Sequence, residues 1–240
     1  MALMLLHTVP DPIALTHWAT RKRWLSPDGD LGYALHALLA EAFEGQAPTP
    51  FRYMNERGLL AYSDADEGDL VRRIDKAPPE TQRLLGLDRL RLKPFPVVWP
   101  GGKRLGFEVR IRPIIRTKAG KERDLYQYRM EQRADEHGES TLTRESVYRE
   151  WLETRLTAGN AARLVNATMH GFTLRQVVRR PHKSADDMQR KPLGVTGPDV
   201  LFRGELAVED AAAFSGLISR GIGRHRAFGY GMLLLRPVRA

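Results

Sequence analysis

The order of predicted strands and helices is the feature of this sequence that most restricts its fold. In the first half, apolar runs and turn residues predict a strand over 1–9, a long helix over 31–43, a strand pair over 51–64, a short helix over 67–74 and an extended segment over 90–98. The helix over 31–43 is the clearest of these, because Asp30 is suited to cap it and only Gly32 interrupts it. Strands and helices therefore alternate, with two strands adjacent in the middle.

The second half repeats this order. It contains an extended segment over 105–115, a helix over 145–156, strands over 171–180 and 201–208, a helix over 209–219 and a last strand over 232–235. Both halves thus follow the order βαββαβ, and we predict an α+β fold of two tandem ferredoxin-like, or RRM-like, domains. The turn residues Pro100, Gly101 and Gly102 indicate the junction, which divides the chain into domains over 1–100 and 103–240.

Charge and composition restrict the partners of such a fold. The formal net charge of +9 attracts polyanions, and nucleic acid is the leading class. No apolar run approaches the roughly 18 residues that span a bilayer, so no membrane partner is expected. The sequence has no cysteine, and its seven histidines include no pair spaced four residues apart, so we expect no disulfide and no metal site. The apolar start lacks the basic end and cleavage site of a signal peptide, which predicts a cytoplasmic protein.

Residues 221–231 form the most distinctive segment, with four glycines and two arginines between a predicted helix and the last strand. Glycines permit positive φ and leave backbone N–H groups uncovered, and arginines add charge-assisted hydrogen bonds to phosphate. The residues concerned are Gly221, Gly223, Arg224, His225, Arg226, Gly229 and Gly231. We predict that this segment contacts RNA; the alternative is a tight turn with solvated arginines.

The spacing of these glycines resembles a family signature. Gly221 and Gly223 flank one apolar residue, five residues follow, and Gly229 and Gly231 close the pattern. Together with the segments 105–113, 159–163 and 200–214, this ending resembles the CasE family, which processes CRISPR RNA in the Cascade complex. A related processing subunit of type IV CRISPR systems is the other family that the pattern fits, and the first third of the chain matches more loosely.

The resemblance implies a function as well as a fold. It implies a metal-independent endoribonuclease that binds the repeat stem-loop of precursor CRISPR RNA, cuts at its base and stays bound to the product beside other effector-complex subunits. It also implies a helix in the first domain that carries a catalytic histidine with a tyrosine nearby, and Tyr33 and His36 are similar to that arrangement. A β-hairpin of the second domain would read the RNA, which points to residues 171–191.

The chemistry of RNA cleavage gives Tyr33 and His36 independent support. They lie off the apolar helix face formed by Leu35, Leu38, Leu39 and Ala42. Histidine can serve as base for the ribose 2′-OH or as acid for the leaving oxygen, and the tyrosine phenol could assist either step. Arg21 and Arg23 are candidates to stabilise the transition state. The products would be a 2′,3′-cyclic phosphate and a 5′-hydroxyl, with no cofactor required.

Other readings of these residues remain open. His36 could be an ordinary histidine on the flank of a helix, and His17 is its serious rival, whereas His7 lies within the first strand and is expected to be structural. The basic and aromatic stretch around Arg21 and Arg23 could be a solvated face. In a type IV protein, arginines would carry more of the catalysis and His36 less.

Two further basic clusters are candidate RNA contacts. The first contains Arg110, Arg112 and Arg116, and the second contains Arg175, Arg179, Arg180, Lys183, Arg190 and Lys191. Each cluster alone would more often be a solvated face, but their combination favours RNA binding. The alternative functions are a non-catalytic subunit that holds the repeat hairpin, and an unrelated DNA-binding or ribosome-associated protein, which would not explain the glycine spacing.

Overall fold

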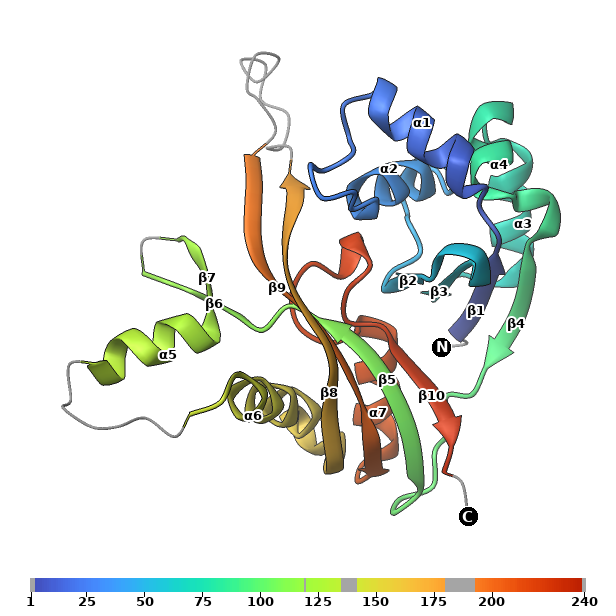
Figure 1. The fold of residues 1–240 in the computed structure, drawn as a ribbon. Helices are drawn as coiled ribbons and strands as arrows, with labels where there is room; N and C mark the ends of the chain where they lie inside the picture. The colour runs from blue at the N-terminus through green and yellow to red at the C-terminus, as the bar shows by residue number, and fades with distance from the viewer. Residues whose placement is uncertain (1–2, 119, 135–141, 180–192, 239–240) are drawn as a thin grey trace. The chain divides into compact units, whose positions relative to one another are not determined.

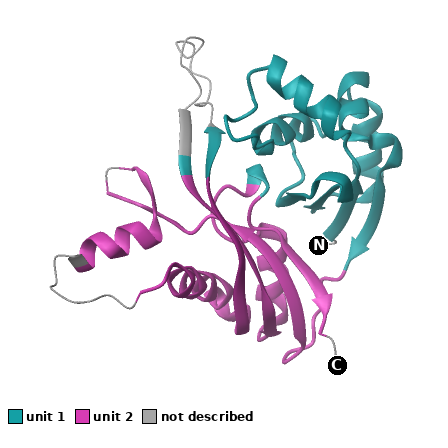
Figure 2. Ribbon diagram, viewed as in Figure 1, with its two compact units in different colours: residues 1–95, 175–196, 227–229 teal, residues 96–174, 197–226, 230–240 magenta. Residues whose placement is uncertain are grey.

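The computed structural model describes residues 3–118, 120–134, 142–179 and 193–238, which form two compact units (Figure 2). The first unit contains residues 1–95, 175–196 and 227–229, and the second contains 96–174, 197–226 and 230–240. The main boundary, between Phe95 and Pro96, is close to the predicted junction at 100–102. Two segments from the second half of the sequence nevertheless belong to the first unit, so the units are not a simple division of the chain at one point.

The first unit contains a four-stranded sheet in the order β2-β3-β1-β4 (Figure 1). Its elements are β1 (Leu3–Thr8), α1 (Pro12–Arg21), α2 (Gly32–Ala42), β2 (Phe51–Tyr53), β3 (Leu59–Ser63), α3 (Glu67–Asp75), α4 (Pro79–Leu85) and β4 (Arg91–Phe95), with short 3-10 turns at Asn55–Arg57 and Leu87–Arg89. All pairings are antiparallel, and Leu6 lies opposite Ala61 on one side and Leu92 on the other. This is the strand order of the ferredoxin-like fold.

The helices of this unit pack on one face of its sheet because their apolar positions recur at helical spacing. Met4 and Leu6 alternate on β1 and enter the same buried cluster as Leu35 and Leu38 of α2. Leu38 has no exposed surface, and burying such a side chain contributes roughly 1.5–3 kcal/mol. The predicted apolar face of the helix over 31–43 is therefore the face that α2 buries.

The second unit has a sheet in the equivalent order, β10-β5-β9-β8. Its elements are β5 (Arg104–Ile111), β6 (Ile114–Arg116), β7 (Glu122–Asp124), α5 (Leu125–Ala134), α6 (Arg144–Leu156), β8 (Ala162–Arg179), β9 (Leu193–Val208), α7 (Ala211–Arg220) and β10 (Leu233–Pro237), with 3-10 turns at Ala158–Asn160 and Arg226–Phe228. β5 is central, since Val109 lies opposite both Phe202 and Leu233. The predicted fold of two ferredoxin-like domains is confirmed.

An insertion between β5 and α6 was only partly predicted. The extended segment expected over 105–115 breaks at Arg112 and Pro113, and β6 pairs with β7 in a separate two-stranded sheet before α5 begins. A buried network attaches the insertion to α6: Tyr148 donates to Asp124 Oδ1 at 2.6 Å and Arg144 donates to Asp124 Oδ2 at 2.7 Å. Burial and the neighbouring Asp124 carboxylate raise the pKa of Tyr148 far above its usual value, so the phenol stays a donor.

In the part of the chain that the structure describes, no helix has the length and apolarity needed to cross a membrane.

Candidate active site

The side chains of Tyr33 and His36 lie on the first turns of α2, three residues apart and therefore on neighbouring positions of the helix surface. Asp30 Oδ1 accepts a hydrogen bond from the Gly32 backbone N–H at 2.9 Å, which stabilises the start of the helix. The helix begins one residue later than the predicted Asp30 cap allows, with Leu31 in the cap position. Both side chains are partly buried, in contrast to the fully buried opposite face.

Phe228, from the glycine-rich segment, completes this group within the first unit. Its ring centroid lies 5.8 Å from that of His36, nearly perpendicular to it, and 6.2 Å from that of Tyr33. Gly32 makes the approach possible, because a Cβ atom at that position would lie 2.5 Å from the Phe228 carbonyl oxygen. Sequence reasoning did not single out Phe228, although it occupies the last of the five positions between the two glycine pairs.

The electrostatic environment of His36 suits a proton acceptor. Burial lowers the pKa of His36 below its usual value of 6.5, so the ring is neutral at pH 7. Its Nδ1 atom is buried and has no hydrogen-bond partner among the described residues. The residue as a whole is only partly buried, and a neutral imidazole can accept a proton from a substrate that reaches its accessible ring nitrogen.

An aromatic series borders the tyrosine. The Trp24 ring lies 5.6 Å from Tyr33 and 5.1 Å from Trp18, both in edge-on geometry. Trp18 is buried at the last turns of α1, and Trp24 is half-buried in the loop before α2. These contacts stabilise the ring of Tyr33 against the end of α1.

The two predicted arginines lie at the end of α1 and directly after it, and both are exposed. Arg21, the last residue of α1, is 73% exposed and forms an ion pair with Glu80 at 3.3 Å. Arg23 is also exposed and adopts a left-handed backbone conformation with φ of 56°. The rival His17 is exposed on α1, and His7 Nε2 lies 3.1 Å from the Arg57 carbonyl oxygen in the structural setting that was expected for it.

The glycine pattern of residues 221–231 has a structural reason. All four glycines adopt positive φ, between 70° and 84°. A Cβ on Gly223 would lie 2.6 Å from Cη2 of Trp151, and a Cβ on Gly231 would lie 2.2 Å from the Ile222 carbonyl oxygen. Backbone conformation and close packing therefore require glycine at these two positions, whether or not the segment also meets a phosphate.

Two predicted RNA contacts are interior groups instead. The Arg112 side chain is in the protein core with 1% of its surface exposed, and the His225 side chain is fully covered, with Nε2 placed 2.8 Å from Glu122 Oε2. Arg110 is mostly buried as well, since it donates two hydrogen bonds to Asp199 and stacks on Tyr230 at 4.3 Å. We correct the expectation for Arg112 and His225, because a covered side chain cannot contact a bound phosphate.

Several other arginines line cavities in the second unit. Two adjoining cavities in the second unit, of about 370 and 350 Å³, share Ile114, Trp151, Arg155 and Arg224. We call their combined space the arginine cavity. Its walls include four residues predicted to contact RNA, Arg116, Gly223, Arg224 and Arg226. They also include Arg155 and Arg129, which sequence reasoning missed. Arg155 lies on α6, 66 residues before Gly221 in sequence, so no local pattern connects it to the glycine-rich segment.

The lining of the arginine cavity favours an anion. None of the described residues that line the two cavities is acidic, although Arg224 pairs with Glu122 at 3.3 Å. Trp151 lines both, and its buried indole N–H has no hydrogen-bond partner among the described residues, while the Arg155 guanidinium lies 5.2 Å from its ring. Guanidinium and indole groups donate hydrogen bonds and accept none, so the ligand they suit supplies acceptor oxygens and negative charge.

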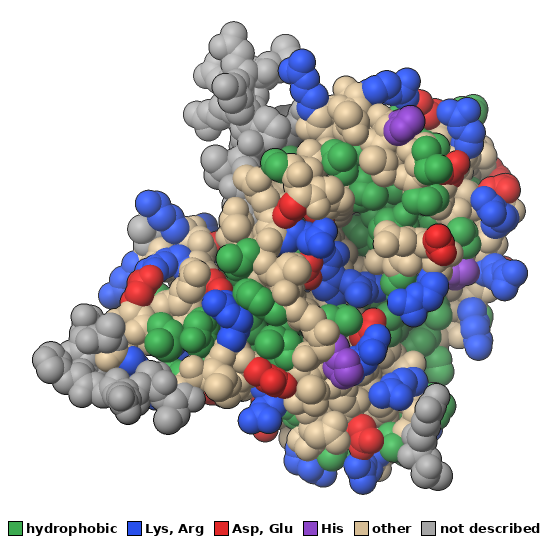
Figure 3. Space-filling view, viewed as in Figure 1, with side chains coloured by type: hydrophobic (Ala, Val, Ile, Leu, Met, Phe, Trp, Pro, Cys, Tyr) green, Lys and Arg blue, Asp and Glu red, His purple; other side chains and the backbone are tan. Residues whose placement is uncertain are grey.

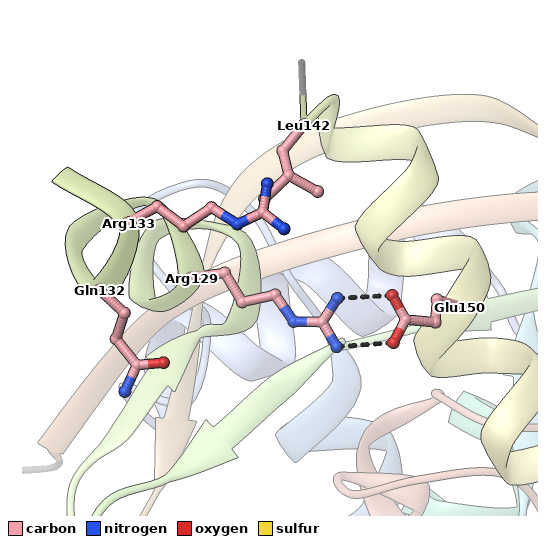
Figure 4. A pocket seen from close by; sticks show the side chains of 5 residues that line it. All are labelled: Arg129, Gln132, Arg133, Leu142 and Glu150. Carbon is pink, nitrogen blue, oxygen red and sulfur yellow. Dashed lines mark hydrogen bonds and ion pairs between the residues drawn. The ribbon is translucent and has the colours of Figure 1, made fainter. Parts of the chain in front are cut away.

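A neighbouring cavity of about 390 Å³ is lined by Arg129, Gln132, Arg133, Leu142 and Glu150 (Figure 4). Here Arg129 donates two hydrogen bonds to the Glu150 carboxylate, at 2.6 and 2.9 Å. These bonds hold the pKa of Glu150 below its usual value, so the charges of the two groups offset each other. Arg129 is therefore less available to a ligand than Arg155 is.

The remaining predicted contacts fall on β8 and beyond. Arg175 is partly buried on β8, and Arg179 is the last residue of that strand. Arg180, Lys183, Arg190 and Lys191 lie outside the described residues. Figure 3 shows lysine and arginine side chains on the surfaces of both units. Among the residues that the structure describes, no group of three or more histidine, aspartate or glutamate side chains is arranged to hold a metal ion.

Comparison with known proteins relates this geometry to a family. Solved structures with similar folds include Thermus thermophilus Cse3 bound to an RNA representing a pre-cleavage complex, with 21% identity, a TM-score of 0.66 and coverage of 99% of this chain and 100% of that chain. A second is the CRISPR endoribonuclease Cse3 bound to a 19-nucleotide RNA, with 22% identity, a TM-score of 0.63 and 98% of each chain covered. A third is Cas6e of Escherichia coli K-12, with 20% identity, a TM-score of 0.52 and coverage of 99% and 100%.

No match was found among curated protein sequences. The model of a family described as CRISPR associated protein, however, matches residues 13–237, nearly the whole chain. The resemblance first seen in the glycine spacing is thereby confirmed at the level of family and fold. This chain belongs to the family of CRISPR-associated proteins.

Proposed function

We propose that this protein is a CRISPR RNA-processing endoribonuclease, which binds the repeat stem-loop of precursor CRISPR RNA and cleaves it without a metal ion. The observation that carries the proposal is the neutral, half-buried His36 beside Tyr33 and Phe228 in a member of this family. Structural similarity to Cse3 bound to RNA supports the same class of substrate. The mature RNA would stay bound as part of an effector complex.

In the proposed mechanism, His36 takes the proton of the ribose 2′-OH next to the scissile phosphate. The 2′-oxygen then bonds to phosphorus, and the bond from phosphorus to the 5′-oxygen breaks. The leaving oxygen needs a proton in the same step, and the phenol of Tyr33 is our candidate donor. The products are a 2′,3′-cyclic phosphate and a 5′-hydroxyl, because the nucleophile belongs to the RNA. Arg23 and Arg21 are our candidates to stabilise the negative charge of the transition state. Arg21 would first have to break its ion pair with Glu80.

Phosphate binding is proposed for the arginine cavity. Arg155, Arg224, Arg116 and Arg226 supply cationic donors around Trp151, with Arg224 shared between the ligand and Glu122. Trp151 is 8% exposed and its ring is partly covered by Arg155, so it offers little surface for stacking a base. We therefore assign this cavity to the sugar–phosphate backbone and not to base recognition. Residues 171–191 remain the proposed RNA-reading hairpin.

Incubating a repeat hairpin RNA with the protein in excess EDTA tests the activity. We expect one cut, a 5′-hydroxyl on the downstream fragment and a 2′,3′-cyclic phosphate on the upstream fragment, with few turnovers because the product is retained. The ends can be identified by mass spectrometry and by resistance of the 3′ end to polyadenylation. Tight binding without cleavage would instead identify a subunit that only holds the hairpin, and cleavage that requires added metal would contradict the mechanism.

The pH dependence of cleavage should reflect the environment of His36. Burial lowers the pKa of this group, so the neutral base persists to lower pH than a free imidazole would allow. We expect kcat/KM to fall about tenfold per pH unit on the acid side, with its midpoint below pH 6.5. His36 in the unfolded chain binds a proton more readily than in the folded protein, so the same shift should destabilise the fold as pH falls through this range.

Measuring kcat/KM from pH 4.5 to 8.5 checks this prediction, since that ratio reports groups of the free enzyme. His17→Ala should keep the acid limb, because His17 is exposed on α1. A midpoint above 6.5, or an acid limb that disappears in His17→Ala, would show that another group is the base.

A further inference from the structure

The loop between α1 and α2 connects the strand β8 to the candidate catalytic helix. Asp28 Oδ2 accepts a hydrogen bond from the Gln176 backbone N–H at 2.8 Å. These residues are 148 positions apart in the sequence, yet both belong to the first unit. The Asp28 side chain therefore links the loop between α1 and α2 directly to the backbone of β8.

The same carboxylate is linked to the start of α2. Ser26 donates its hydroxyl to Asp28 Oδ1 at 2.5 Å, and the Ser26 oxygen accepts the Asp30 backbone N–H at 2.7 Å. Asp30 in turn accepts the N–H of Gly32, the first residue of α2, at 2.9 Å. Ser26 and Asp30 are almost fully buried. A continuous chain of hydrogen bonds therefore runs from Gln176 to the turn that carries Tyr33.

The charge state of Asp28 supports this arrangement. Burial alone would raise the pKa of Asp28, but the hydrogen bonds from Ser26 and Gln176 and the charge of Arg175 hold it below its usual value. The group is therefore ionised at neutral pH and can accept from both partners.

We propose that Asp28 is a positioning residue that holds β8 at Gln176 against the loop before α2, and so keeps the strand that meets the RNA in register with Tyr33 and His36. The inference rests on the proposed function, because only an RNA-cleaving protein needs these two elements aligned on one substrate. Displacing reacting groups by about 1 Å can slow a reaction by about a hundredfold. Asp28 itself need not touch the RNA.

Two variants of Asp28 separate the contact from the charge. Asp28→Ala removes both, whereas Asp28→Asn removes the charge but keeps an oxygen that can accept from Gln176. Asp66→Ala is the matched control, because Asp66 caps α3 through the Asp69 backbone N–H at 2.8 Å, away from this loop. Single-turnover cleavage, RNA affinity and amide hydrogen exchange at Gln176 are measured for each in the full-length protein.

We expect Asp28→Ala to lower the single-turnover rate by about tenfold or more, to change RNA affinity much less and to speed amide exchange at Gln176. Asp28→Asn and Asp66→Ala should stay near the wild-type rate. Unchanged exchange at Gln176 in Asp28→Ala, an unchanged rate, or equal losses in the Ala and Asn variants would each overturn the proposal. Failure of the proposed function would be distinct, since it would already appear as an absence of cleavage by the wild-type protein.

Discussion

Replacing His36 with alanine is expected to slow cleavage of the repeat hairpin by a factor of about 10²–10⁴, the usual contribution of a positioned acid or base. Binding of the RNA should persist, because the arginine cavity and β8 are unchanged. The imidazole is the group to remove because its ring is neutral at pH 7 and only partly buried beside Tyr33 and Phe228. Single-turnover cleavage in EDTA and filter binding measure the two effects separately.

Two further variants serve as controls for His36→Ala: one removes a different histidine, and the other places a different residue at position 36. His17→Ala should cleave normally, since His17 is exposed on α1. His36→Gln should be as slow as His36→Ala although it fills the space better, which separates lost chemistry from lost packing against Phe228. Normal cleavage by His36→Ala would contradict the mechanism and would move the base to His17 or the catalysis to Arg21 and Arg23.

Neutralising two arginines of the arginine cavity should have the largest effect on affinity. A hydrogen bond to a charged group contributes about 1.5–3 kcal/mol, so Arg155→Gln combined with Arg224→Gln should weaken binding of the repeat RNA by about a hundredfold at low salt. Glutamine keeps much of the packing of Arg155 on Trp151. The cleavage rate of RNA that is fully bound should change little.

The salt dependence of the same variant tests whether phosphates are the ligand. Each lost phosphate contact should reduce the slope of log K against log salt concentration by about 0.7–0.9, so the double variant should lose about 1.5 from the slope. The matched control is Arg104→Gln with Arg163→Gln, two arginines of the same unit that pair with Glu205 and Glu209 and do not line the cavity. Equal losses in both double variants would show that only net charge matters and would contradict a defined phosphate site.

Local pattern was enough to predict the helix that carries the candidate catalytic residues. The residues expected over 31–43 form α2 over 32–42, and the four predicted apolar positions are buried. Helical periodicity and a capping residue depend only on neighbouring positions, so the sequence carries them directly. The second half shows the same rule for α6, expected over 145–156 and found over 144–156.

Burial of polar residues did not follow from local pattern. Arg110 and Arg112 alternate with apolar residues and were expected to contact RNA, yet Tyr230 lies beneath both guanidinium groups, at 4.3 and 5.4 Å. Alternation tells which side of a strand a residue occupies, but what covers that side comes from distant parts of the chain. The same limitation explains why His225 was expected to meet RNA and is instead covered beside Glu122.

By itself, the sequence determined the order of elements, the two ferredoxin-like domains, the glycine pattern of the family and the pairing of Tyr33 with His36 on one helix. Only the tertiary structure decided that Phe228 joins these two side chains, that Arg155 joins Arg224 around one cavity and that Asp28 bonds to Gln176. The physical reason is the range of the interactions: propensity, periodicity and backbone strain act between neighbours, whereas a site is assembled by packing between segments far apart in the chain.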